Sequence, residues 1–131
     1  MIVDASALVA IVCKEPEREL FLQAIAASPA RLVSAVTAFE ATMVLEGRYG
    51  ADAGAMMEWF LLEARIETVP FNATHTELAR VAWRQFGKGN HPAALNFGDC
   101  CVYALARWFD LPILCKGNDF ARTDVSLVRF A

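Results

Sequence analysis

The chain has 131 residues, of which 56% are apolar, and a formal net charge of −3. This length suits one domain with one core, residues 1–131, and the negative charge argues against broad, non-specific binding to nucleic acid, which requires a basic face. The longest apolar run, near residues 5–13, is shorter than the ~20 residues of a membrane span, and no signal peptide is recognisable, so we expect a cytoplasmic protein without membrane contact.

The first half of the chain alternates short apolar runs with segments of helical periodicity. A buried strand ends at Val3, and Pro16 suits the first turn of a second helix, which closes before Pro29. Gly50 separates two further helices, and Pro70 bounds the strand that follows them. The expected order is a strand at 2–3, helices at 5–13 and 16–27, a strand at 31–34, helices at 36–49 and 51–64, and a strand at 66–69.

The second half continues the same pattern. Asn72 or Thr74 can cap a helix that reaches Phe86, and residues 87–97 form a loop broken by two glycines and a proline. The helix at 99–109 is apolar nearly all round, which predicts that it is buried. Strands at 112–115 and 125–128 complete a three-layer α/β/α domain with a mainly parallel central sheet of about five strands, in which sites form beyond the carboxyl ends of the strands.

Three acidic residues stand where a strand or loop gives way to a helix or turn. Asp4 follows the first strand, Asp99 follows Gly98 at the start of the buried helix, and Asp119 lies just past the fourth strand. Each has an ordinary alternative role, because Asp commonly caps helices and Gly-Asn-Asp commonly forms turns. Taken singly, none of the three identifies a site.

Glu40 is harder to explain as a structural residue. Its neighbours three and four positions away on a helix are mostly apolar, and the nearest basic residue of that helix, Arg48, is two turns distant. The neighbours are Val36, Thr37, Met43 and Val44. An unpaired charge on an apolar stripe is costly, so this carboxylate needs a cation.

The four carboxylates together point to a metal. Two carboxylates about 5 Å apart repel by about 3 kcal/mol at an effective dielectric constant of about 20, so a convergent set is a poor device for stability. A hard divalent cation relieves this repulsion, and Mg²⁺ takes one or two carboxylates together with water and phosphate oxygens. Such a site cleaves phosphodiesters by orienting water and by neutralising charge on the phosphate.

Four segments resemble the PIN-domain toxins of VapBC toxin–antitoxin systems. They are residues 1–8 (MIVDASAL), 34–40 (SAVTAFE), 96–106 (NFGDCCVYALA) and 114–124 (LCKGNDFARTD), in the family's order and spread over nearly the whole chain. The resemblance implies a PIN-like fold and a Mg²⁺-dependent endoribonuclease, with Mn²⁺ as a substitute metal, that arrests translation and growth by cutting structured RNA such as tRNA or rRNA. It also implies inhibition by a cognate VapB-type antitoxin and, commonly, a homodimer.

The family's acids map onto Asp4, Glu40, Asp99 and Asp119. We expect Asp4 and Asp99 to bind the metal directly and the other two acids to complete the pocket through water or a second metal. Ser6 can hydrogen-bond a carboxylate or water, although a hydroxyl at a helix start is equally often structural. Asp124 is a fifth acid, for which a turn role is favoured. Many relatives have Thr where this chain has Ala5, so a small polar contact is missing here.

A partner that supplies positive charge is also expected. An apolar fraction above the ~45–50% of ordinary soluble domains indicates a surface that another chain covers. In the helix at 51–64, a broad apolar stripe comprises Met56, Met57, Phe60, Leu61 and Ala64, with Trp59 beside it. Core packing explains such a stripe as well as a groove for an amphipathic partner helix does. In the second case an Arg or Lys of the antitoxin can enter the acidic site and block the metal.

The remaining reactive side chains have ordinary explanations. The cysteines resemble small buried hydrophobic residues rather than zinc ligands, and His75 and His91 do not form a ligand-spaced pair. Lys88 and Lys116 lie in loops near the inferred site but are solvated lysines by default. Two other functions compete with the nuclease: a non-catalytic PIN-like interaction module, and an Asp-based phosphoryl-transfer domain, which the Asp-Ala-Ser sequence after the first strand disfavours.

Overall fold

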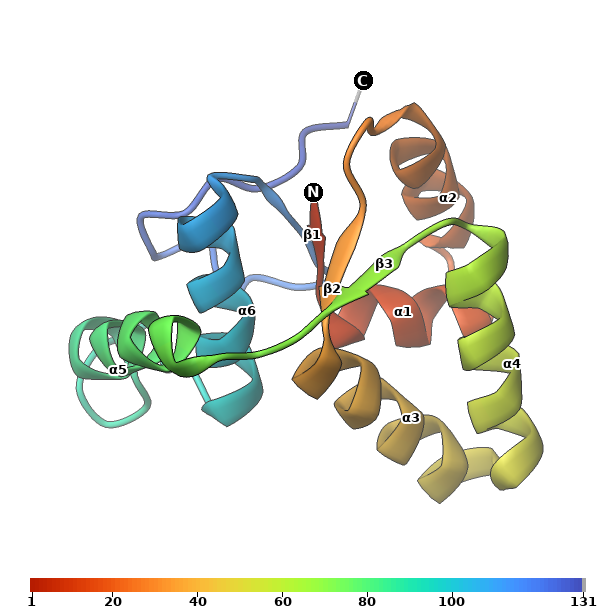
Figure 1. The fold of residues 1–131 in the computed structure, drawn as a ribbon, viewed down its shortest axis with the longest axis horizontal. Helices are drawn as coiled ribbons and strands as arrows, with labels where there is room; N and C mark the ends of the chain where they lie inside the picture. Colours follow the sequence, from red (N-terminus) through yellow and green to blue (C-terminus); the bar gives the residue numbers. More distant parts are fainter. Residues whose placement is uncertain (131) are drawn as a thin grey trace.

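The computed structural model describes residues 1–130, which form a parallel sheet between two groups of helices (Figure 1). The four strands are β1 (Ile2–Val3), β2 (Leu32–Ser34), β3 (Glu67–Val69) and β4 (Ile113–Leu114), in the spatial order β3-β2-β1-β4. Ile2 lies opposite Leu32 on one side and Ile113 on the other, so β1 is a central strand. The predicted α/β class and parallel sheet are confirmed.

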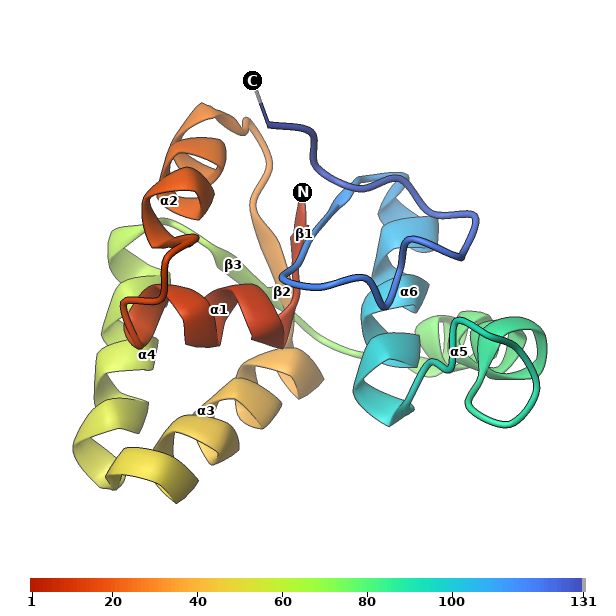
Figure 2. The same cartoon turned by 180° about the vertical axis from the view of Figure 1, so that it is seen from behind.

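Six helices are found in the described part of the chain. They are α1 (Ala5–Val12), α2 (Arg18–Ala27), α3 (Ala35–Tyr49), α4 (Ala51–Glu63), α5 (Ala73–Phe86) and α6 (Phe97–Phe109). Figures 1 and 2 show α5 and α6 on one side of the sheet and α1, α2 and α4 on the other. None of the six combines the length and hydropathy that a bilayer-spanning helix requires.

The two faces of the sheet bury separate apolar clusters, because successive side chains of a strand point to opposite faces. Ile2 and Ile113 pack with residues of α5 and α6, among them Leu105. The next residues along the same strands, Val3 and Leu114, pack with residues of α1 to α4. Strands of two or three residues therefore contribute side chains to both apolar clusters.

Two sequence predictions about element boundaries are corrected. Pro16 lies in a turn before α2 rather than in its first turn, and α2 begins at Arg18. Lys14, in the turn that leads from α1 to α2, has a positive φ of 55°. The segment predicted as a fifth strand forms a single bridge between Leu127 and Ile113. Strand β4 has only two residues, and Ile113 alone exchanges backbone hydrogen bonds with this segment.

The parallel strands end at a common edge, and three helices begin there. α1 follows β1 directly, and α3 follows β2 with Ser34 as its N-cap. The first turn of α6 packs against α3, where Gly98 meets Glu40. This edge is where sites form in open parallel sheets, and it gathers the acids that the sequence singled out.

Candidate acidic site at the strand ends

Asp4 is the N-cap of α1 and lies at the end of the central strand. Its Oδ2 accepts hydrogen bonds from the Ser6 backbone N–H at 3.1 Å and from the Ser6 hydroxyl at 2.5 Å, and its own N–H donates to the Leu114 carbonyl at 2.9 Å. Burial raises the pKa of Asp4, the Ser6 hydrogen bonds lower it, and the charge of Asp119 raises it. The capping role therefore exists, and it fixes the carboxylate at the strand end.

The Ser6 hydroxyl connects two parts of the site. It donates to Asp4 and accepts from the backbone N–H of Lys116 at 2.9 Å. Lys116 begins the loop that carries Asp119, so one side chain ties the start of α1 to a loop that lies 110 residues further along the chain. This double hydrogen bond restrains the Asp4 carboxylate and the loop after β4 together.

Asp99 lies in the first turn of α6, which begins at Phe97 and not, as predicted, at Asp99 itself. Asn96 is the N-cap: the Asp99 N–H donates to Asn96 Oδ1 at 2.9 Å, and the Asn96 N–H donates to Asp99 Oδ2 at 3.1 Å. This reciprocal capping box extends the helix by two residues. Burial raises the pKa of Asp99 to about 6; the hydrogen bond from Asn96 lowers it, and the three other acids raise it.

Glu40 reaches the same place from α3, where its carboxylate lies against Gly98. A Cβ built at Gly98 would come within 2.3 Å of Glu40 Oε2, so any larger residue must displace the carboxylate. Burial raises the pKa of Glu40, and the charge of Asp4 raises it further. The predicted stripe around Glu40 is only partly covered: Thr37 is buried, whereas Met43 is exposed.

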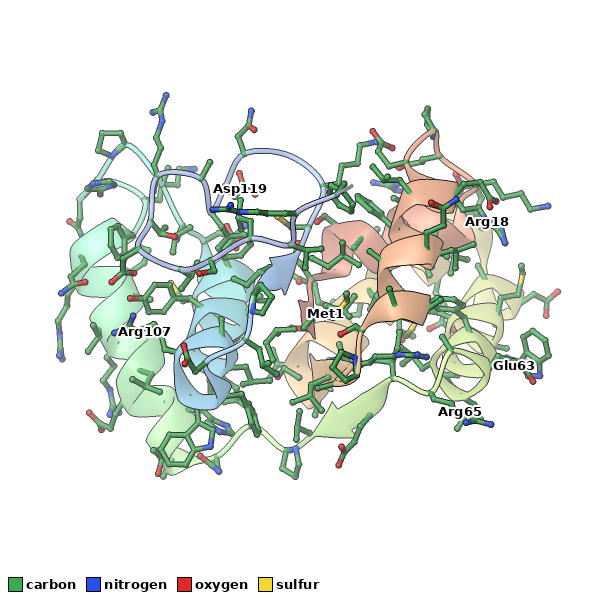
Figure 3. The ribbon with its side chains drawn as sticks, turned by 90° about the horizontal axis from the view of Figure 1, so that it is seen from above. Met1, Arg18, Glu63, Arg65, Arg107 and Asp119 are labelled. Carbon is green, nitrogen blue, oxygen red and sulfur yellow. The ribbon has the colours of Figure 1, made fainter. Side chains whose placement is uncertain are left out.

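Asp119 is exposed and lies in the turn after β4 (Figure 3). Within this turn the Ala121 N–H donates to the Asn118 carbonyl at 3.1 Å, and the buried ring of Phe120 anchors the turn in the core. The turn role therefore exists as well. The charge of Asp119 contributes to the raised pKa of both buried aspartates, so the turn holds this carboxylate close to them.

The structure brings all four predicted acids together without a protein counter-ion. We use the name acidic pocket for these four side chains alone: Asp4, Glu40, Asp99 and Asp119. Across residues 1–130 none of them forms an ion pair with a basic side chain, and Lys116, on the same loop as Asp119, pairs instead with Glu15 at 3.2 Å and Glu17 at 3.4 Å. A pocket of uncompensated carboxylates matches the oxygen-ligand chemistry of a hard cation.

The acidic pocket is not a preformed coordination sphere. Among the described residues, no group of three or more acidic, cysteine or histidine side chains converges closely enough to hold an ion. Charge on neighbouring acids nevertheless raises the pKa of Asp4, Glu40 and Asp99, so these side chains share one electrostatic field. Both findings fit Mg²⁺ or Mn²⁺, because Mg²⁺ usually binds one or two carboxylates and keeps several waters.

Asp124, the fifth acid, lies outside the acidic pocket. Its Oδ1 accepts a hydrogen bond from the Tyr103 hydroxyl at 2.8 Å, and its Oδ2 lies 3.9 Å from Arg107. Burial and this hydrogen bond raise the pKa of Tyr103 to about 12. These contacts connect α6 to the segment that follows β4.

Local hydrogen bonds engage one ring nitrogen of each histidine. The buried His75 accepts the Asn72 N–H at its Nδ1 at 3.2 Å, as part of the cap of α5. His91 accepts the Ala93 N–H at its Nδ1 at 3.0 Å. All four cysteines are free thiols and are buried or partly buried, as expected of small hydrophobic residues.

Three neighbours of the acidic pocket were missed in the sequence. Gly98 permits the approach of Glu40, and its own position beside Asp99 gave no sign of that contact. Asn96 could have been recognised, because it precedes Asp99 by the three residues of an N-cap and its partner. Cys115 also borders the acidic pocket: burial, together with the charge of three of the acids, raises its pKa to about 12.

The predicted stripe of the helix at 51–64 is divided between core and surface. Met57 and Leu61 are buried, whereas Met56 is 55% and Trp59 65% exposed. The exposed members line a hollow of about 460 Å³ between α4 and the end of α1, which we call the α1–α4 hollow. Its other lining residues include Ile11, Val12, Phe60, Lys14, Arg18 and Asp52.

Comparison with known proteins places these features in one family. The PIN domain family model matches residues 1–126. A "Ribonuclease VapC" from Mycolicibacterium smegmatis is 42% identical over 128 residues, covering 98% of this chain and 99% of the relative. The crystal structure of Mycobacterium tuberculosis VapC20, a sarcin–ricin loop cleaving toxin, has a TM-score of 0.78 at 19% identity, covering 98% of each chain. VapBC2 from Rickettsia felis, bound to a promoter DNA fragment, has a TM-score of 0.75 at 17% identity, covering 99% of this chain and 98% of that one.

Proposed function

This chain belongs to the PIN-domain family of VapC ribonucleases, and from that premise we propose that it is the toxin of a toxin–antitoxin pair and cuts structured RNA in a Mg²⁺-dependent reaction. Transfer RNA and ribosomal RNA are the substrate class, in line with the structurally similar VapC20, which cleaves the sarcin–ricin loop. Residues 1–131 act as one nuclease domain. The acidic pocket is the observation that carries this proposal.

Asp4 and Asp99 are the direct metal ligands in this proposal. Both are buried, and in both a hydrogen bond to Oδ2 fixes the carboxylate. When bound, Mg²⁺ neutralises charge on the scissile phosphate and favours attack by water. Glu40 and Asp119 are less buried and hold water around the ion. Ser6 positions Asp4 and contacts neither RNA nor metal.

Protons compete with the cation for this site. The pKa of Asp99 is raised to about 6, so a metal-free protein carries a proton there in mildly acidic solution. Because a carboxylate must be deprotonated to bind metal, affinity for Mg²⁺ falls as the pH drops below that value.

The antitoxin supplies the positive charge that the acidic pocket lacks. We place an amphipathic helix of a VapB-type antitoxin in the α1–α4 hollow, with its apolar face on Met56 and Trp59. An Arg or Lys from the same segment then pairs with the carboxylates and blocks the metal. A homodimer of the toxin, which the resemblance implies, stays a prediction.

The metal requirement is tested with purified, chelator-treated protein and a labelled RNA hairpin. We expect cleavage to return with Mg²⁺ or Mn²⁺ and to stop in EDTA, and Asp4→Asn protein prepared in parallel shows whether a contaminating nuclease is responsible. Cleavage in EDTA by the wild type but not by Asp4→Asn overturns the metal mechanism. Folded wild-type protein that cuts no RNA with either metal is instead a non-catalytic interaction module.

A further inference from the structure

A second and larger hollow adjoins the acidic pocket. It has a volume of about 790 Å³ and lies between α5, the start of α6 and the start of α3; we call it the α5–α6 hollow. Its lining includes three residues of α6: Phe97, Cys100 and Cys101. In the same turn, Asp99 belongs to the acidic pocket and Gly98 contacts Glu40. One helical turn therefore separates the hollow from the carboxylates.

The two thiols of this wall confirm the short separation. Burial and, to a smaller extent, the Asp99 charge raise the pKa of Cys100 to about 11. Burial likewise raises the pKa of Cys101 to about 11, with smaller contributions from Cys100 and then from Glu40. A ligand in the α5–α6 hollow is thus within electrostatic reach of the acids.

Exposed aromatic rings line the α5–α6 hollow. Phe97 is 76% exposed and Trp83 is 46% exposed, although both side chains are large and apolar. Phe97 lies two residues before Asp99. Unstacked bases of single-stranded RNA stack on such rings regardless of their sequence.

The charged side chains that line the α5–α6 hollow are all basic. They are Arg80, Arg84 and Lys88, which follow one another at four-residue intervals on α5 and the loop after it. Arg80 pairs with Glu77, whereas Arg84 and Lys88 form no ion pair among the residues that the structure describes. In a chain of net charge −3 this is a local concentration of positive charge, of the kind that follows an RNA backbone.

We infer that the α5–α6 hollow holds the single-stranded part of the RNA substrate beside the cleaved bond, with a base stacked on Trp83 or Phe97 and phosphates bound by Arg84 and Lys88. The inference rests on the proposed ribonuclease function. A second copy of the chain fits less well, since a two-fold contact would bring the same basic wall of each copy together. The hollow therefore attracts the negatively charged RNA, which the acidic pocket alone would repel.

The test measures RNA affinity apart from cleavage. Wild-type protein and variants are titrated in EDTA against a fluorescently labelled RNA hairpin with an unpaired loop, and anisotropy is recorded over a range of salt concentrations. Trp83→Ala should weaken binding by about tenfold. The double change Arg84→Ala and Lys88→Ala should lower the slope of affinity against salt by about 1.4, as for two lost single-strand phosphate contacts.

Matched variants control for general effects. Trp108→Ala removes another exposed tryptophan, and Arg48→Ala with Arg65→Ala removes two other exposed arginines; each should bind within about twofold of the wild type. Trp83→Phe keeps an aromatic face and should restore most of the affinity. If Trp83→Phe retains RNA affinity, the loss in Trp83→Ala is due to the missing aromatic ring and not to misfolding.

Three results overturn the inference. The first is the absence of measurable RNA binding by the wild type, and the second is an equal loss of RNA affinity in the test and control variants. In the third result the variants keep their RNA affinity but lose a dimer in sedimentation, which would make the hollow an interface between copies. Cleavage with Mg²⁺ is measured separately. Protein that cuts RNA but is indifferent to these changes refutes the hollow alone, whereas protein that binds RNA through the hollow without cutting it refutes the ribonuclease proposal alone.

Discussion

The α1–α4 hollow and the α5–α6 hollow are made of similar parts but have different surroundings. Each contains an exposed tryptophan and at least two basic side chains. The α1–α4 hollow lies at the far end of α1, where Val12 follows Asp4 by eight residues, or about 12 Å along a helix. Figure 3 shows Arg18, which lines this hollow, on the opposite half of the molecule from Asp119.

The α5–α6 hollow, by contrast, shares one helical turn with Asp99. Its charged lining is entirely basic, whereas the α1–α4 hollow also contains Asp52. Apolar character alone would assign the same kind of ligand to both. We assign RNA to the α5–α6 hollow and the antitoxin to the α1–α4 hollow because the two differ in their distance from the carboxylates and in the sign of their local charge.

Asp99→Asn sharpens the comparison most, because it should stop the chemistry while leaving both hollows intact. Asn keeps the shape and can still accept the Asn96 N–H, so the capping box and the helix should persist. We expect RNA cleavage to fall by about 10²-fold or more, with RNA affinity in EDTA retained. Asp124→Asn is the matched control outside the acidic pocket and should be milder. Full toxicity of Asp99→Asn at equal abundance would contradict the ligand assignment.

Met56→Asp addresses the partner side of the comparison. A charge in the α1–α4 hollow should weaken binding of the antitoxin by about 10- to 100-fold, because an apolar anchor would face a carboxylate. The measurement is affinity for the co-expressed antitoxin, by titration calorimetry. Leu62→Asp is the control, since Leu62 is 78% exposed on the same helix but does not line the hollow. Equal losses in the two variants would mean that the antitoxin binds elsewhere on α4.

Gly98→Ala tests the turn that separates the acidic pocket from the α5–α6 hollow. The new methyl group must push the Glu40 carboxylate away, and we expect cleavage to fall by about tenfold with a stability loss of about 1 kcal/mol. Adding Glu40→Asp shortens the side chain that collides. Glu40→Asp alone is the reference: if Gly98→Ala lowers cleavage as much in the Glu40→Asp background as in the wild type, steric displacement of Glu40 is not the cause.

The remaining prediction concerns the stability of the metal-free protein, which does not depend on either hollow. Asp99 has a folded-state pKa of about 6, above its unfolded value, so its protonated form favours folding. This stabilisation is complete below pH ~4 and is lost as the pH rises through about 6. The full shift corresponds to about 3 kcal/mol, of which screening by solvent leaves roughly 1–2 kcal/mol. Urea unfolding in EDTA at pH 5 and pH 7 should show the loss in the wild type and a smaller one in Asp99→Asn. An identical pH dependence in both proteins would contradict the shifted pKa.

Local sequence signals were enough to predict most of the fold. Prolines and glycines bounded the helices, and the strand-to-helix junctions at Asp4 and Ser34 follow directly from the pattern of apolar residues. The four acids of the acidic pocket were found because three stand where a strand or loop gives way to a helix or turn and because Glu40 has no close basic neighbour on its helix. Their convergence follows from parallel strands that end at one edge.

What the sequence could not predict depends on contacts between distant segments. The meeting of Glu40 with Gly98 requires knowing how α3 crosses α6, and neither residue indicates it alone. The fifth strand failed because its length is set by its partner, β4, which offers only Ile113 for pairing. A helical stripe of apolar residues likewise has the same spacing whether it faces a core, as Met57 does, or solvent, as Met56 does.

The hydrogen bond from the Lys116 amide to the Ser6 hydroxyl gives the acidic pocket a built-in spectroscopic reporter. The amide donates to a hydroxyl whose proton is committed to Asp4, so a change in charge at Asp4 alters the polarity of the acceptor that the amide senses. Lys116 would therefore show a displaced nitrogen–proton resonance when an ion binds or Asp4 gains a proton. Its backbone nitrogen neither titrates nor ligates, so occupancy of the acidic pocket can be followed by NMR in an unmodified, isotope-labelled protein.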